Sequence, residues 1–155
     1  MDEAKWRKIA ALYQENDIEN LKKRMKYQPL ILKITPELNE QYLYAEQDYA
    51  ERYVSGGTDG KVYAHPALML HQSLATRSPS FSLPPNMAGV HAVDEVEWFG
   101  AAEVGRTYTI NWEFTDIYEK RGKVYLVSSA IVTDQENNVI MHRNMHSVTM
   151  GGEKK

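Results

Sequence analysis

Cysteine is absent from this 155-residue chain. Its absence excludes disulfide bridges, thiolate zinc sites and a cysteine nucleophile. Long apolar runs are missing too, since none approaches the roughly 20 residues of a membrane-spanning helix. The first residues, MDEAKWRK, lack the apolar core of a signal peptide. We therefore expect a cytoplasmic protein without a membrane partner.

Basic charge is not in excess either. The 18 Lys and Arg residues are outnumbered by 21 Asp and Glu residues, for a net charge of -3. A nucleic-acid-binding protein normally carries a clustered basic face, so we expect no nucleic-acid partner. The length suits a single domain that buries a core without disulfides or metal.

The histidine spacing disfavours a metal site. His142 and His146 lie in a segment with the alternating pattern of a strand, which separates them by roughly 13 Å at ~3.3 Å per residue. That distance is too long for both rings to bind one ion. We expect no metal.

The N-terminal segment has a helical pattern. Apolar residues recur with helical spacing over residues 2–26. Asn16 and Glu19 resemble a capping box, so this segment forms either one helix or two. Leu30–Ile34 follows as a short strand candidate.

Two further helices are predicted before the middle of the chain. Residues 35–49 open with the Thr-Pro-Glu of a helix start. The glycine-rich turn at residues 56–60 then leads to Pro66, which suits a first helical position because that position needs no N–H. Residues 66–77 are the most apolar helix-like run, with apolar residues on most of its circumference. We expect this helix to be deeply buried.

The second half of the chain has the period-two pattern of strands. The predicted strands of this antiparallel meander are residues 91–99, 106–118, 123–134 and 138–150. The third of these is apolar on both faces, as a central strand should be. The chain is therefore assigned to the α+β class, as an antiparallel sheet wrapped around a central helix.

Several phrases resemble the MaoC-like branch of the hot-dog fold superfamily. They are ITPELNEQYLYAEQD, GKVYAHPALML, HAVDEVEWFGAAEVGRTYTI and YEKRGKVYLVSSAIVTDQENNVIMHRNMHSVTM. The resemblance implies an N-terminal helical extension (1–29), one hot-dog domain (30–150) and a tail (151–155). It also implies a dimer with sheets joined side by side, and acyl-thioester sites between subunits.

The catalytic motif of that family has the form Gly-Asp-x-Asn-Pro-x-His. This chain reads QDYAERY over residues 47–53, so Asp48 falls on the aspartate and Tyr53 on the histidine. A gapless alignment from the side of His65 instead moves Asp48 onto the histidine. The resemblance makes Asp48 and Tyr53 the catalytic candidates. Their alternative roles are a capping carboxylate for Asp48 and packing for Tyr53, because a phenol with a pKa near ~10 is a poor base at neutral pH.

The resemblance places the thioester pocket at the start of the apolar helix. The residues that it implies for substrate binding are Gly60, His65, Pro66, Ala67 and His71. The family usually has His-Gly there, with the glycine N–H donating to the thioester oxygen; this chain has a proline, which has no N–H. The N–H of Ala67 or of His65 remains as a donor. The alternative roles are a structural histidine with satisfied hydrogen bonds for His65 and a hydrogen-bonded core histidine for His71.

These departures leave several functions open. The resemblance implies a hydratase or dehydratase acting on thioesters of coenzyme A or acyl carrier protein, with no other cofactor. The altered motif instead resembles the non-catalytic half that pairs with a catalytic MaoC-like chain. A hot-dog thioesterase is disfavoured because residues 67–77 contain no carboxylate, and a non-enzymatic acyl-CoA-binding domain is the remaining alternative. The partner is accordingly an acyl thioester, within a homodimer or a heterodimer.

Overall fold

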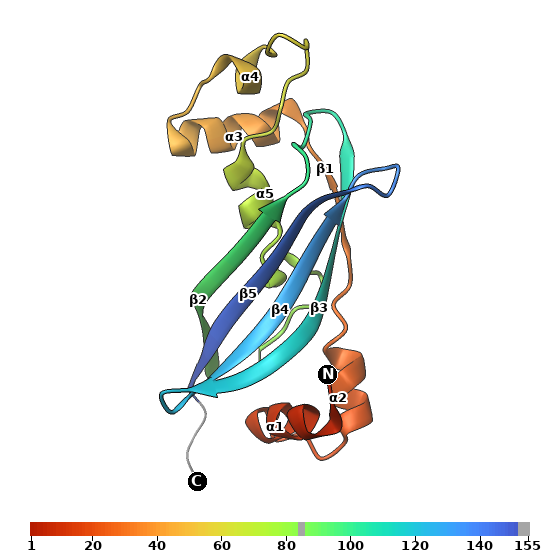
Figure 1. Cartoon of the computed structure of the whole chain (residues 1–155), viewed down its shortest axis with the longest axis vertical. Coiled ribbons are helices and arrows are strands. Elements are labelled where there is room, and N and C mark those ends of the chain that lie inside the picture. The colour runs from red at the N-terminus through yellow and green to blue at the C-terminus, as the bar shows by residue number, and fades with distance from the viewer. Residues whose placement is uncertain (84–85, 152–155) are drawn as a thin grey trace.

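A computed structural model describes residues 1–83 and 86–151. Its helices lie at the two ends of the molecule and along one face of a sheet (Figure 1). They are α1 (Glu3–Tyr13), α2 (Ile18–Arg24), α3 (Pro36–Glu46), α4 (Glu51–Val54), α5 (Pro66–Gln72) and the 3-10 turn η1 (Ala75–Arg77). Within the described residues, no helix is long and apolar enough to cross a membrane.

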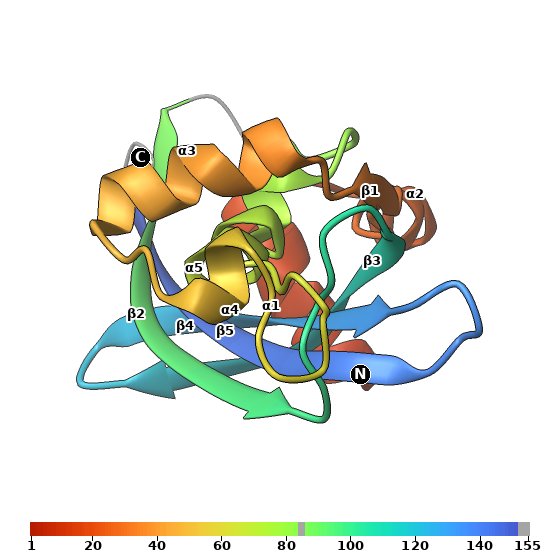
Figure 2. The same ribbon diagram turned by 90° about the horizontal axis from the view of Figure 1, so that it is seen from above.

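One five-stranded antiparallel sheet forms the body of the molecule. Its strands are β1 (Leu30–Lys33), β2 (Met87–Trp98), β3 (Thr107–Lys120), β4 (Lys123–Thr133) and β5 (Val139–Gly151), in the order β1-β3-β4-β5-β2. The sheet curls around α5, and α3 and α4 lie over one end of the curl (Figure 2). The expected helix wrapped by an antiparallel sheet is therefore confirmed, with β4 in the centre as its apolar pattern predicts.

The strands align their inward side chains in rows across the concave face. One row runs from Trp112 through Ala130 to Arg143, and these three residues are directly paired across β3, β4 and β5. All three are buried. This row lies beneath α5, because the indole N–H of Trp112 donates to the Ser73 carbonyl oxygen over 2.7 Å.

The core consists of two hydrophobic clusters. The larger one joins α5 to the part of the sheet nearest α3, which is the upper part in Figure 1, and includes Leu68, Met69 and Met141. The smaller one joins α1 and α2 to the far ends of β3 and β4, through residues such as Leu21 and Ile117. The N-terminal hairpin is thus packed on the sheet by its own apolar cluster.

The N-terminal segment forms two helices rather than one. Asp17, not Asn16, caps the second helix: its carboxylate accepts hydrogen bonds from the backbone N–H groups of Glu19 and Asn20. An ion pair between Lys5 and Asp116 attaches α1 to β3.

The central helix was predicted over residues 66–77 but is shorter, since α5 ends at Gln72. The reason lies in the side chains of the sheet that bind its last residues. Arg143 donates hydrogen bonds to the Leu70 carbonyl and to the Ser73 hydroxyl, while Trp112 holds the Ser73 carbonyl. These carbonyls are bound by side chains of the sheet, so the chain leaves the helix there. The burial is also one-sided: Leu68 and Met69 are buried, and His71 is exposed.

Smaller differences lie at the ends of elements. The helix predicted to reach Tyr49 ends at Glu46, because Gln47 adopts a left-handed conformation with φ of 55°. The short helix α4 was not predicted from the sequence. Gly151 belongs to β5 rather than to a tail, and the rest of that tail lies outside the described residues.

Candidate functional site

The start of α5 lies beside the loop between α3 and α4. Asn39, a buried residue of α3, binds both neighbours: its Nδ2 donates to the Tyr53 carbonyl over 3.1 Å, and its Oδ1 accepts from the His65 N–H over 2.9 Å. Asn39 therefore fixes α4 against the residue that caps α5. No motif in the sequence marks this role, although a polar residue on the inner side of an amphipathic helix was a usable signal.

The backbone N–H groups at the start of α5 are hydrogen-bonded to acceptors within the chain. Pro66 has no N–H, Ala67 N–H donates to His65 Nδ1 over 3.1 Å, and Leu68 N–H donates to the His65 carbonyl over 3.0 Å. The His65 N–H is held by Asn39. The backbone donors that could have bound a thioester oxygen all have partners within the chain.

Asp48 and His65 form a pair. His65 Nε2 lies 3.3 Å from Asp48 Oδ2, and Asp48 Oδ1 accepts from the Ala50 N–H over 3.1 Å. Because His65 Nδ1 accepts the Ala67 N–H, Nε2 carries the ring hydrogen and points it at the carboxylate. The structure thus brings together two residues that the sequence placed in separate motifs.

Tyr53 packs rather than pairs. Its side chain is buried, its ring meets the His65 ring edge-on with centroids 5.0 Å apart, and the Arg52 guanidinium lies over it at 4.6 Å. This geometry orients the imidazole and favours the packing role for Tyr53.

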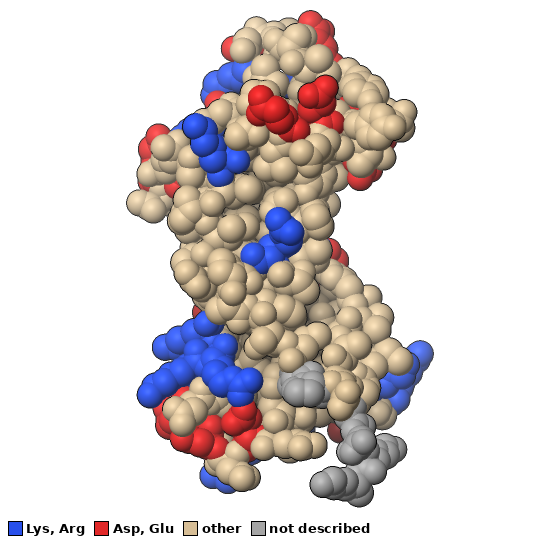
Figure 3. All heavy atoms as spheres, turned by 180° about the vertical axis from the view of Figure 1, so that it is seen from behind, with Lys and Arg blue, Asp and Glu red and all other residues tan. Residues whose placement is uncertain are grey.

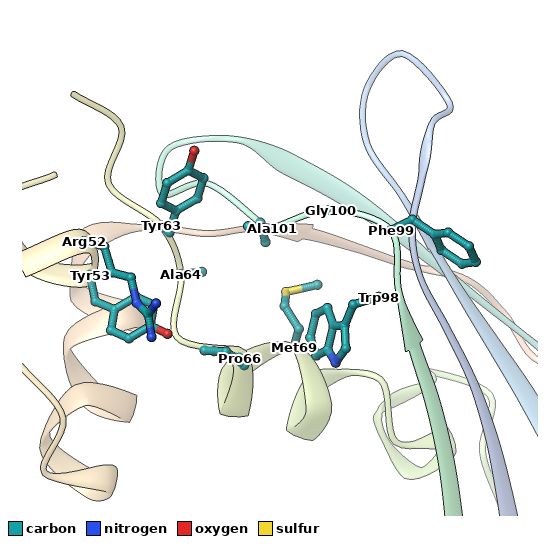
Figure 4. Close-up of a pocket in the computed structure, with 11 residues that line it drawn as sticks. Arg52, Tyr53, Tyr63, Ala64, Pro66, Met69, Trp98, Phe99, Gly100 and Ala101 are labelled. Carbon is teal, nitrogen blue, oxygen red and sulfur yellow. The ribbon is translucent and has the colours of Figure 1, made fainter. Parts of the chain in front are cut away.

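An open apolar pocket of about 520 Å³ adjoins this helix start; we call it the upper pocket. Arg52 and Tyr53 line one side of it, Met69 and Trp98 the other, and Pro66 lies between them (Figure 4). Neither Asp48 nor His65 is among its lining residues. The paired acid and imidazole are therefore screened from the pocket, with the Tyr53 ring packed against the imidazole.

The other predicted site residues lie elsewhere. The exposed His71 is hydrogen-bonded through Nδ1 to the Tyr42 hydroxyl at 2.6 Å, so it is neither a core histidine nor part of the upper pocket. Gly60, with φ of 73°, makes a turn and lines a different hollow beside α3. Of the predicted residues, Tyr53 and Pro66 line the upper pocket; Arg52 and Trp98 were missed.

The described residues bring no three His, Asp or Glu side chains close enough together for a metal site. His142 is hydrogen-bonded to the Ser129 hydroxyl at 2.9 Å, and His146 to the Tyr118 hydroxyl at 2.9 Å. The two rings thus have separate partners on the convex face of the sheet.

Comparison with known proteins gives a match in structure alone. No family model matches the chain, and no curated protein matches its sequence. R-hydratase PhaJ1 from Pseudomonas aeruginosa is 10% identical with a TM-score of 0.64, covering 84% of this chain and 86% of that one. The HadBC (3R-hydroxyacyl-ACP dehydratase) complex from Mycobacterium tuberculosis is 9% identical with a TM-score of 0.63, covering 81% and 97%.

A MaoC-like dehydratase from Rhodospirillum rubrum is similar to the same extent: 12% identity, a TM-score of 0.62, and coverage of 84% of this chain and 92% of that one. At such identities the likeness establishes the fold and leaves the chemistry to the residues of the site. The chain has the hot-dog fold, and its structural neighbours include MaoC-like dehydratases, as the sequence phrases predicted.

Proposed function

We propose that this chain is the non-catalytic, acyl-thioester-binding half of a two-chain hydratase or dehydratase. Its partner would be a MaoC-like chain that carries the intact aspartate and histidine. The HadBC complex among the structural neighbours is a precedent for a dehydratase complex on this fold. The substrate class is a 3-hydroxyacyl or enoyl thioester, carried on coenzyme A or acyl carrier protein.

The observation that carries this proposal is the internal pairing at the start of α5. Hydration of an enoyl thioester needs a base for the water and donors for the oxygen that gains charge. Here Ala67 N–H is bound by His65, and His65 is bound by Asp48. A substrate would have to break the contact between Ala67 and His65 before that N–H could bind its oxygen or His65 Nδ1 could act as a base.

The upper pocket supports the binding part of the proposal. Its wall is mostly apolar, as acyl-chain sites are, and Arg52 adds a cation at its edge that suits a phosphate of the carrier. The pocket can therefore hold the thioester even though the chain offers it no chemistry.

The exposed edge of β2 is the proposed subunit interface. Among the strands of the described residues, β2 is bonded to β5 on one side and to none on the other. Val90, Val93, Trp98 and Phe99 are exposed along or just after this edge. A free apolar edge is a template for pairing with another strand, so a partner sheet can continue this one.

A self-contained hydratase is the second candidate, because Asp48 and His65 are already within contact distance. In that case the pair would act as acid and base after the substrate displaces the Ala67 N–H. A thioesterase remains disfavoured, because α5 contains no carboxylate. A non-enzymatic acyl-CoA-binding domain would share the upper pocket and lack the catalytic partner.

Co-expression separates these functions. The purified chain should not hydrate crotonyl-CoA, and activity should appear when it is combined with a MaoC-like chain carrying the intact motif. A gene for such a chain beside this one would identify the partner to test. Activity of the chain alone that Asp48→Asn abolishes, in a folded protein, would support the self-contained hydratase instead.

A further inference from the structure

A second cavity of about 250 Å³ lies at the other end of the concave face; we call it the lower cavity. It lies between the two hydrophobic clusters of the core. Aromatic residues line one wall: Tyr27 from the segment after α2, Phe81 from the loop after η1 and Phe114 from β3. Stacking fixes that wall, since the Tyr27 ring lies 5.9 Å from the rings of both Phe81 and Phe114.

Two features leave the space of the lower cavity open: the early end of the central helix and the small inward side chains at the end of β5. The central helix stops at Gln72, so it covers only the upper rows of the sheet. In the lower rows, the inward residues of β5 change from methionine to Ser147 and Thr149, which are paired with His91 and Gly89 of β2. Small side chains here leave open the space that a leucine or a longer helix would fill.

A polar partition separates the lower cavity from the upper pocket. Arg143 is buried in the row between them, and its guanidinium donates to both carboxylate oxygens of Asp94 while also binding the end of α5. Met69 lines the upper pocket and Met145 lines the lower cavity, and among the described residues the two linings share no member. The lower cavity is therefore a separate site.

The mouth of the lower cavity lies toward β2. The lining residues Leu83, Gly89 and His91 are exposed, whereas Met145 and Leu126 are buried at the far side. On the helix-covered face of the molecule, most charged side chains gather toward the two ends, and the band between them is mostly uncharged apart from a basic side chain at its centre (Figure 3).

The lining selects an uncharged ligand. Among the described residues, no lysine or arginine lines the lower cavity, and the histidine that lines it, His91, already lies 3.5 Å from the Asp94 carboxylate, so a carboxylate ligand would enter without an unpaired cation. Hydroxyl groups of Ser128, Ser147 and Thr149 offer hydrogen bonds to a neutral oxygen. The volume is below the roughly 300 Å³ at which drug-sized sites begin, which suits a single unbranched chain rather than a fused ring system.

We propose that the lower cavity binds the unbranched chain of a neutral acyl compound, an ester or thioester, with the chain against Phe81 and Met145 and the carbonyl near Ser147. This inference stands on the cavity of the chain by itself and does not require the proposed catalytic partner. An ester and a thioester present the same chain and a neutral carbonyl, so the experiment includes both.

Methionine methyl NMR tests the site on the full-length chain alone. Met145 lines the lower cavity and Met69 lines the upper pocket, so their ¹³C-methyl signals report the two sites separately. Methyl octanoate should shift the Met145 signal and leave that of Met69 in place, and octanoate should bind at least about tenfold more weakly, because its charge has no partner. Octanoyl-CoA shifting Met145 would identify the thioester as the source; a shift with methyl octanoate alone would identify a free ester.

Two variants change the volume in opposite directions. Ser147→Leu should weaken methyl octanoate binding by about tenfold or more by filling the lower cavity. The control is Ser55→Leu: Ser55 is an exposed serine directly after α4, at the opposite end of the molecule, and its replacement should leave binding unchanged. Phe81→Ala should favour methyl decanoate over methyl octanoate, and it serves if Ser147→Leu does not fold. Three results would overturn the proposal: a shift confined to Met69, no shift at Met145 with either methyl octanoate or octanoyl-CoA, or an affinity for octanoate equal to that for methyl octanoate.

Discussion

His65 connects Asp48 to the first backbone N–H of α5, that of Ala67. One ring nitrogen of His65 faces the carboxylate at 3.3 Å, and the other accepts the Ala67 N–H at 3.1 Å. Histidine thereby serves as the N-cap of the helix, in a place where serine, threonine or aspartate is usual. A group that could act as a base is used to stabilise a helix start.

Restoring a donor at the start of α5 should restore recognition of the carbonyl. Pro66→Gly adds an N–H at the first helical position, and this N–H has no intrahelical acceptor. We expect the variant to bind crotonyl-CoA about fivefold more tightly, since one hydrogen bond contributes about 1 kcal/mol, with a loss of stability of about 1 kcal/mol. Calorimetric titration with crotonyl-CoA and with free coenzyme A, which lacks the carbonyl, measures this; a parallel gain for both ligands would refute the interpretation.

Arg143 should be among the most sensitive positions of the core. Arg143→Met keeps an unbranched apolar stem but removes the guanidinium donors to Asp94, Leu70 and Ser73. We expect it to lower the free energy of unfolding by about 3 kcal/mol, the low end for a broken buried pair because Asp94 remains partly exposed. Urea denaturation provides the measurement. Asp94→Asn keeps an acceptor and should cost less than half as much; an equal cost would show that the contacts with α5 contribute little.

Alkaline pH should destabilise the protein through Tyr27. Burial raises the pKa of Tyr27 above the usual value of about 10. The folded state therefore favours the neutral phenol, and this contribution is present below about pH 10 and is lost as the pH rises beyond it. Urea unfolding between pH 8 and pH 11 should show a steeper decline for the parent chain than for Tyr27→Phe, which keeps the ring stack. Parallel declines would contradict this origin.

Assembly should depend on β2 and not on the opposite edge. Val93→Lys places a charge on the free edge of β2 and should abolish association, as measured by light scattering after gel filtration. Ile31→Lys is the matched control, because Ile31 is also an exposed apolar residue on an edge strand, β1. Loss of assembly in the control but not in Val93→Lys would move the interface to β1.

The fold was largely predictable because its periodic signals are local. The strands of the second half alternate cleanly, and Pro36 and Pro66 mark helix starts that the structure confirms. The end of α5 was not predictable, since it depends on Arg143 and Trp112, which come from strands 39 or more residues later in the chain. An apolar run indicates where a helix can continue and not where a distant side chain stops it.

The candidate site was predictable in part. The sequence identified Asp48 and His65 separately, and the replacement of glycine by Pro66 indicated an altered donor set. Their pairing could not be read from the sequence, because it depends on how Asn39 positions α4 and the helix start. The lower cavity left no motif either, since it arises from small residues on strands and the early end of a helix.

The hydration of crotonyl-CoA by the purified chain, with and without a catalytic MaoC-like partner, tests the central proposal most directly. The proposal predicts no measurable hydration by the chain alone and activity in the complex that is unchanged by Asp48→Asn. Hydration by the chain alone that disappears in Asp48→Asn, with the fold intact by circular dichroism, would contradict it.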